Sequence, residues 1–223
     1  VYGTDALRYA LTSLTNGNPQ DVRLQVNREK IKTKKGELPS YNVSIPRFEE
    51  GRRFCNKIWQ ASRGVVFRQC EGYTPDHTIE ALEDRWLYHR LHKGIEFIED
   101  ALTRYDLGAA SDELYRLFWD DFCSWYLEVI KPRLWGEYGE ASKAQAQTHL
   151  VESLDTLLRL LHPFVPIISE ALWQELQDIK EKAGERDNAE ALIVAEWPKA
   201  ENFTKDDEVE AQSQMMRQVT AAI

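Results

Sequence analysis

Residues 46–68 carry the helical period that most constrains how this chain can fold. Read at helical pitch, the segment divides into an apolar face and a cationic face. The apolar face is wide enough to pack on a core and consists of Phe54, Cys55, Ile58, Trp59, Ala61, Ser62, Val65 and Val66. The opposite face consists of Arg52, Arg53, Asn56, Lys57, Gln60 and Arg63. Pro46 suits the first turn of a helix, and Glu49 and Glu50 suit the positive end of its dipole.

The cationic face contrasts with the charge of the whole chain. Residues 46–68 contain six Arg or Lys and two Glu, a balance of +4, whereas the chain has a formal net charge of −9. Arg and Lys neutralise phosphates, and Asn or Gln can hydrogen-bond to base edges, so this face suits a nucleic acid. A solvated helix with ordinary surface charge explains the same pattern. The acidic total argues against a protein that binds DNA or RNA through its whole surface.

The other apolar patterns also have a helical period, and they predict an all-α bundle of about five main helices. Residues 46–68 are one of these five, the other four cover residues 79–105, 107–130, 140–161 and 167–180, and further helices are predicted over 1–14, before the bundle, and over 206–223, after it. Thr4, Thr78 and Asp106 are placed to cap the helices over 1–14, 79–105 and 107–130 at their N-termini. Residues 107–130 are apolar on most sides, which predicts a central helix. A hydrophobic content of 43% supports a substantial core.

Two stretches break the helical pattern. Residues 20–45 include a lysine-rich run with Gly36 and Pro39, which predicts an exposed hairpin or a mobile loop. A solvated loop explains this run better than a contact to an RNA backbone does. Residues 191–198, with the sequence ALIVAEWP, are predicted to form an extended apolar piece.

The sequence contains no catalytic or metal-binding signature. It lacks the G-x-x-x-x-G-K-[ST] phosphate loop, the nucleophile elbow and the spacing of zinc ligands. Asp120 and Asp121 form the one tempting carboxylate pair, and a structural role suits them better. His89 and His92 lie one helical turn apart, but the sequence offers no third ligand of matching geometry. We therefore expect these residues to provide neither catalysis nor a metal or cofactor site.

The cysteines and the apolar runs bear on where the protein resides. Cys55, Cys70 and Cys123 form no C-x-x-C pair and lie in or beside helical patterns, which is typical of reduced thiols in a cytoplasmic protein. No apolar run is long enough to span a bilayer, so we expect no membrane partner. The chain begins without Met and inside a helical pattern, which we interpret as a piece of a longer protein.

Four stretches together cover nearly the whole chain in a recognisable order. They are YGTDALRYAL at 2–11, FCNKIWQASR at 54–63, FWDDFCSWYLEVIKP at 118–132 and HPFVPIISEALWQEL at 162–176. Their order and distances resemble those of the valyl-tRNA synthetases, a family of class I aminoacyl-tRNA synthetases. The resemblance implies a connecting region at 1–45 with a lysine-rich insertion, an anticodon-binding helical bundle at 46–198, and the start of a truncated C-terminal region at 199–223.

The resemblance also implies a function. The chain would hold the anticodon arm of valine tRNA, while a catalytic domain of the same protein attaches valine with ATP. The family's two ATP signatures, His-x-Gly-His and Lys-Met-Ser-Lys-Ser, are absent from this sequence, so this region is expected to bind without catalysing. The apolar side of the first helix, at Leu7, Leu11 and Leu14, is expected to be exposed because its partner domain is missing.

The resemblance assigns nine residues to the anticodon arm, on two helices that would face each other across a groove. They are Arg47, Arg53, Asn56, Lys57, Trp59, Arg63, Leu127, Glu128 and Lys131. Arg and Lys would contact phosphates, Asn56 and Glu128 would hydrogen-bond to base edges, and Leu127 would pack on an unstacked base. Trp59 suits core packing better than stacking. Gly64 stands where many family members carry an aromatic residue, so a stacking contact is either absent or supplied by Phe67.

Two other interpretations stay open. The anticodon-binding domains of class I synthetases for isoleucine, leucine, methionine or cysteine share the bundle, although FCNKIW and FCSWYLE favour valine. A helical protein-interaction module without an RNA role is the more distant alternative, and the net charge of −9 is its main support. Salt-dependent binding to tRNA would distinguish an anticodon-binding domain from a protein-interaction module.

Overall fold

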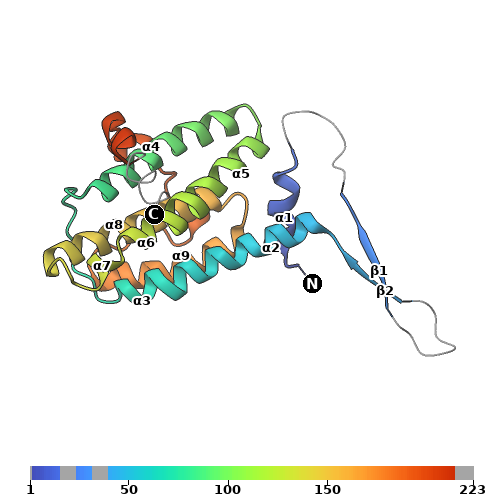
Figure 1. Ribbon diagram of the computed structural model, residues 1–223, viewed down its shortest axis with the longest axis horizontal. Coiled ribbons are helices and arrows are strands. Elements are labelled where there is room, and N and C mark those ends of the chain that lie inside the picture. The colour runs from blue at the N-terminus through green and yellow to red at the C-terminus, as the bar shows by residue number, and fades with distance from the viewer. Residues whose placement is uncertain (1, 16–23, 32–39, 214–223) are drawn as a thin grey trace.

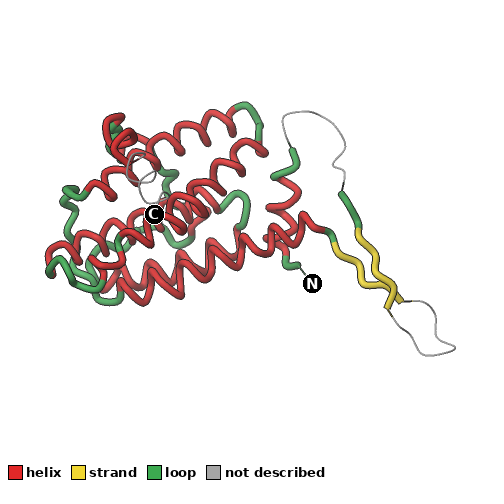
Figure 2. The backbone as a smooth tube through the Cα atoms, in the orientation of Figure 1, coloured by secondary structure: helices red, strands yellow, loops and turns green. Residues whose placement is uncertain are grey.

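The computed structural model describes residues 2–15, 24–31 and 40–213, which form a helical bundle with one projecting β-hairpin (Figure 1, Figure 2). The helices are α1 (Thr4–Thr12), α2 (Pro46–Trp59), α3 (Phe67–Cys70), α4 (Leu82–Thr103), α5 (Leu107–Tyr115), α6 (Leu127–Val129), α7 (Lys131–Leu134), α8 (Glu140–Leu161) and α9 (Pro166–Lys182). Two π-helical segments, Gln60–Val66 and Arg116–Tyr126, join α2 to α3 and α5 to α6. The hairpin consists of β1 (Asn27–Ile31) and β2 (Ser40–Ser44). The predicted all-α fold is confirmed, with this hairpin as its only sheet among the described residues.

The amphipathic helix predicted for residues 46–68 is present as α2, the π-helical segment and α3 in one run. Pro46 occupies its first turn and Glu49 follows in the same turn, as predicted. The buried positions of this run are Phe48, Gly51, Phe54, Ile58, Ala61, Ser62, Val66 and Cys70. Gly51 allows α1 to approach closely, because a Cβ there would lie 2.4 Å from the carbonyl oxygen of Ala6. The predicted core face is therefore confirmed.

One of the three predicted helix caps is confirmed. Asp106 Oδ1 accepts a hydrogen bond from the backbone N–H of Ala109 at 3.0 Å. The caps predicted at Thr4 and Thr78 are wrong, since α1 begins after Gly3 and α4 begins after Ala81. Thr78 is held outside the helix because its carbonyl oxygen accepts from His149 Nε2 at 3.0 Å. A tertiary contact thus overrides the local capping signal.

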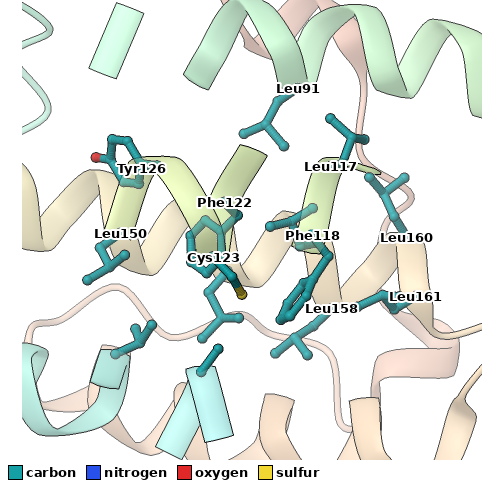
Figure 3. Close-up of a cluster of buried hydrophobic side chains, with 14 of the residues drawn as sticks. Leu91, Leu117, Phe118, Phe122, Cys123, Tyr126, Leu150, Leu158, Leu160 and Leu161 are labelled. Carbon is teal, nitrogen blue, oxygen red and sulfur yellow. The ribbon is translucent and has the colours of Figure 1, made fainter. Parts of the chain in front are cut away.

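The segment Arg116–Tyr126 is the centre of the bundle (Figure 3). Phe118, Phe122 and Tyr126 are 0% exposed, and leucines of α4 and α8 surround them. This confirms the prediction of a central helix. The polar residue Asp121 is mostly buried and accepts a hydrogen bond from Arg90 Nε at 2.9 Å, whereas Asp120 is exposed. The predicted structural role of the Asp120–Asp121 pair therefore holds for Asp121.

The chain after α9 is held against α4 by two histidines. His89 Nδ1 accepts from the backbone N–H of Asp206 at 3.0 Å, so its Nε2 carries the proton toward Glu210 at 2.8 Å. His92 Nδ1 lies 2.8 Å from the carbonyl oxygen of Ala200. Both rings are thus engaged in packing this segment, and no three His, Cys, Asp or Glu groups within the described ranges could hold a metal.

The predicted extended piece at 191–198 is corrected in part, because Leu192–Val194 forms a 3₁₀ turn. A second such turn spans Ala200–Asn202, and residues 207–213 are helical as predicted, while the rest of the predicted helix lies outside the described residues. None of the helices that the structure describes is both long and apolar enough to cross a membrane.

Helix α1 packs on α2 and α9, and only one side of it is open. Asp5 accepts hydrogen bonds from the backbone N–H groups of Ile167 and Ile168, at 3.3 and 2.7 Å. Leu7 and Leu11 are 39% and 38% exposed, which confirms the open apolar side predicted there, although Leu14 is half-buried. The division of the chain at residues 45 and 198 stays a prediction.

The loop between α3 and α4 is held by His77. Its Nδ1 lies 2.6 Å from Glu152 Oε1 and its Nε2 lies 2.6 Å from Glu185 Oε1. Burial lowers the pKa of His77, but these two carboxylates outweigh burial, so the pKa is raised. The pKa of buried His149 is raised in the same way, by Glu152 and Asp84 against burial. Glu152, on α8, contacts both rings and so joins His77 to the helix that carries His149.

We expect the thermal stability of this chain to fall as pH rises above about 6.5, the ordinary pKa of histidine. A group whose pKa is raised by folding stabilises the fold below its unfolded pKa, and the contribution is lost as pH passes through the folded pKa. His77→Gln keeps hydrogen-bonding capacity without titrating, so its melting temperature should depend less on pH between 6 and 8. Melting curves followed by circular dichroism measure this. An unchanged pH dependence in His77→Gln would show that His77 does not link the loop to Glu152 and Glu185.

Candidate nucleic-acid interface

The polar face of α2 and of the π-helical segment after it is open to solvent. Its exposed side chains are Arg47, Arg52, Arg53, Asn56, Gln60 and Arg63, and Lys57 is half-buried. The face is directed outward because Phe54 and Ile58, on the opposite side, are 1% and 0% exposed. Arg47 to Arg63 spans a row of charged and amide groups about 24 Å long. This length can follow several phosphates of a nucleic-acid strand.

Ion pairs on this face are weak. Arg47 Nη1 lies 2.9 Å from Glu50 Oε2, and Arg63 Nε lies 2.9 Å from Glu175 Oε2. Both pairs are exposed to solvent, and such pairs contribute about 0–1 kcal/mol to stability. A phosphate can therefore take the place of either carboxylate at little cost.

A pair of aromatic rings lies beside the cationic face. Tyr115 and Trp119 are stacked, with ring centroids 5.4 Å apart and planes inclined by 10°. Lys57 Nζ lies 5.2 Å from the centroid of the Trp119 ring, which joins α2 to the central helix. Both rings are half-buried, so each keeps an accessible part. The sequence analysis described residues 107–130 only as apolar on most sides and did not single out this pair, although aromatic residues at i and i+4 of a helix were the available signal.

These rings form one wall of a cavity of about 380 Å³, a volume within the range of small-ligand sites. Its lining residues are Tyr9, Ala10, Ser13, Arg47, Glu50, Gly51, Arg53, Phe54, Asp112, Tyr115 and Trp119. Burial, and then Asp120 and Glu50, raise the pKa of Tyr115, while Arg53 lowers it by less. The phenol therefore stays neutral and can donate a hydrogen bond. The cavity combines cationic, aromatic and hydrogen-bonding groups.

Trp59 is half-buried and packs against the core, as predicted. The guanidinium carbon of Arg63 lies 4.8 Å from the centroid of the Trp59 ring. Trp59 also lines a second cavity, of about 350 Å³, with Asn56 and Ile168. A Cβ at Gly64 would meet only the Gln60 side chain, at 3.6 Å, and Phe67 packs against the core.

The second predicted wall needs correction. Leu127 is 5% exposed and belongs to the core, so the predicted contact of its side chain with a base is wrong. Glu128 is exposed, Lys131 is half-buried, and a hydrogen bond joins them. The cavity beside α2 is walled by Asp112, Tyr115 and Trp119 instead. Leu127 directly follows the π-helical segment and packs in the core with it.

The structure is a helical bundle that exposes a cationic, amide-bearing helix next to stacked aromatic rings. This combination is typical of helical domains that bind RNA. Residues 84–223 match the family described as the anticodon-binding domain of tRNA ligase. The chain belongs to this family.

The relatives extend the match to α1, the hairpin and α2. The chain is 38% identical to the valine–tRNA ligase of Thermosynechococcus vestitus over 96% of its own length. It is 44% identical to that of Gloeobacter violaceus over 82% of its length and 36% identical to that of Thermotoga maritima over 94%. The chain spans 22%, 19% and 20% of these three proteins. It therefore corresponds to about a fifth of each.

Proposed function

We propose that this chain is the anticodon-binding region of a cytoplasmic valine–tRNA ligase. Its task is to hold the anticodon arm of valine tRNA while a catalytic domain of the same protein attaches valine with the energy of ATP. The observation that carries the proposal is the row of cationic and amide side chains on α2, set beside Tyr115 and Trp119. The names of the relatives support valine as the amino acid.

The residues proposed to bind the anticodon arm have different chemical roles. Arg47, Arg53, Lys57 and Arg63 neutralise phosphates, which gives affinity without sequence preference. Asn56 and Glu128 hydrogen-bond to base edges, which gives preference for an anticodon. Trp59 and Lys131 hold Arg63 and Glu128 in place.

Tyr115 and Trp119 supply a stacking surface for an unpaired base. The two rings are already stacked on each other and the Trp119 ring contacts Lys57, so a base added to the pair meets an aromatic ring and a nearby cation. In this role they replace Leu127, which is buried. The surface is part of the cavity that Arg53 and Arg47 also line, so base and phosphate contacts come together there.

We expect this chain to bind a transcript of valine tRNA with an affinity that falls steeply with salt. The four side chains of the α2 face that contact phosphates contribute about −3 to the slope of log affinity against log salt concentration. Fluorescence anisotropy of labelled tRNA measures it, with unlabelled duplex DNA as a competitor that should displace little of the tRNA. A slope near zero would favour a protein-interaction module over an RNA-binding domain.

A further inference from the structure

The β-hairpin has two chemically different faces. Its register pairs Arg28 with Val43 and Lys30 with Tyr41, and it pairs Asn27 with Ser44 and Glu29 with Asn42. Side chains alternate along each strand and directly paired residues share a face. One face therefore carries Arg28, Lys30, Tyr41 and Val43, which we call the cationic hairpin face. The other carries Asn27, Glu29, Ile31, Asn42 and Ser44.

The cationic hairpin face is exposed. Tyr41 and Val43 are 51% and 54% exposed, and Arg28 and Lys30 are exposed beside them. Val26, just before β1, continues the same alternation and is 46% exposed. A two-stranded hairpin alone is marginally stable in water, and these apolar side chains find no core within the described residues. Their exposure is therefore better explained by a partner than by stability.

Charge decides which partner fits this face. It carries two positive side chains and an aromatic ring, and the one carboxylate of the paired residues, on Glu29, lies on the opposite face. This separation occurs in a chain with a formal net charge of −9. A polyanion that also carries aromatic bases suits both the positive charges and the aromatic ring, since phosphates pair with Arg and Lys and bases stack on Tyr. RNA has this chemistry.

The hairpin is joined to the N-terminal end of α2. β2 runs through Ile45 directly into Pro46, the first residue of α2. The backbone N–H of Ile45 donates to Tyr2 Oη at 3.0 Å, and the Tyr2 ring packs edge-on against Phe48 at 5.7 Å. Five residue pairs extend about 17 Å at the usual rise of a strand. The hairpin thus projects away from the bundle beyond the N-terminus of α2 (Figure 1).

We propose that the β1–β2 hairpin is a second RNA-binding element, which contacts a part of the same tRNA that α2 does not reach. Arg28 and Lys30 contact backbone phosphates, and Tyr41 stacks on an unpaired base. This inference rests on the proposed function, because the tRNA that binds α2 is what brings RNA to the hairpin. It differs from the sequence analysis, which favoured a solvated loop for the lysine-rich run; residues 32–39 of that run lie outside the described residues.

The test compares matched charge changes on the two hairpin faces. Arg28→Gln with Lys30→Gln removes two positive charges from the cationic hairpin face, and Asn27→Asp with Asn42→Asp makes the same net change on the other face. We expect the first pair to weaken binding of the valine tRNA transcript about tenfold and to reduce the salt slope by about 2. The control pair should weaken binding less than twofold, and Tyr41→Ala should weaken it without changing the salt slope. All side chains involved are exposed, so the bundle stays folded.

Arg53→Gln in the same assay separates the two proposals. Suppose that Arg53→Gln weakens tRNA binding, while the double substitutions on the two hairpin faces change tRNA affinity equally. The hairpin inference is then overturned and the proposed function stands. If Arg53→Gln also leaves binding unchanged, the proposed function fails. Full tRNA affinity in the Arg28 and Lys30 variant would identify the cationic hairpin face as a protein contact and overturn the inference.

Discussion

Replacement of Asp84 by Ala is expected to lower the free energy of unfolding by about 3–5 kcal/mol. Asp84 is fully buried, and its two oxygens accept from Tyr126 Oη at 2.7 Å and from Arg133 Nη1 at 2.8 Å. Arg133 is 5% exposed, so loss of the carboxylate leaves a guanidinium in the core with Glu83 as its remaining acidic partner. Because α4, the central helix and α7 meet here, the effect should extend to the whole bundle.

Urea denaturation followed by circular dichroism measures this loss. Glu83→Ala is the matched control, since Glu83 pairs with the same guanidinium at 2.9 Å but its side chain is more exposed. This substitution should lower the free energy of unfolding by less than Asp84→Ala does. Combining Asp84→Ala with Arg133→Ala should cost less than the sum of the two single changes, because the double variant leaves neither of these two buried charges without the other. If the losses of free energy in the two single variants simply add up in the double variant, Asp84 and Arg133 are not a coupled pair. Other contacts would then stabilise this end of the bundle.

The second large effect concerns the cationic face of α2. Exchange of Arg53 and Lys57 for Gln is expected to weaken binding to every tRNA alike and to reduce the salt slope by about 2, because these side chains contact phosphates. Asn56→Ala is expected to act differently. It should reduce the preference for the valine anticodon by about 1–3 kcal/mol, because an amide that reads a base edge gives discrimination. Gln60→Ala is the control, since Gln60 is also an exposed amide, one turn further along.

Competition binding with two labelled tRNAs measures both effects in one experiment. Equal loss of affinity and of discrimination in all variants would show that the cationic face acts as a single electrostatic patch. Loss of discrimination in Gln60→Ala but not in Asn56→Ala would move the base contact one turn along the helix.

The sequence alone was sufficient for features that depend on local chemistry. Pro46 marks the start of α2, Asp106 caps α5, and the predicted bounds of the helix over 140–161 agree with α8. The period of the apolar residues gave the core face of α2, because burial follows helical geometry.

Features that depend on tertiary contacts were not predictable in the same way. Thr78 has the composition of a cap, but the ring of His149 binds its carbonyl and α4 begins later. The sequence offered His89 and His92 no third metal ligand, but it did not show that they hold the segment that follows α9. A sequence pattern gives the spacing of such groups along the chain but not the distant residues that they meet.

The facing wall of the candidate site was placed by the family resemblance and not by the pattern of this sequence. The resemblance assigned Leu127, Glu128 and Lys131 to it, but Leu127 is 5% exposed, and Trp119 lines the cavity beside Arg53. The segment Arg116–Tyr126 is π-helical, so its residues do not follow the α-helical period. A run as apolar as 114–130 gives no signal for this change of pitch.

The central claim, recognition of an anticodon, is tested most directly by the affinity of this chain for two transcripts. One is valine tRNA, and the other is the same RNA altered only at the middle and third anticodon bases. Our account predicts that the unmutated chain binds the first about 5- to 150-fold more tightly, at a salt concentration where both are bound, since one read base edge contributes about 1–3 kcal/mol. Equal affinity for the two RNAs would contradict the account, because the face of α2 and the Tyr115–Trp119 cavity would then bind RNA without reading its anticodon.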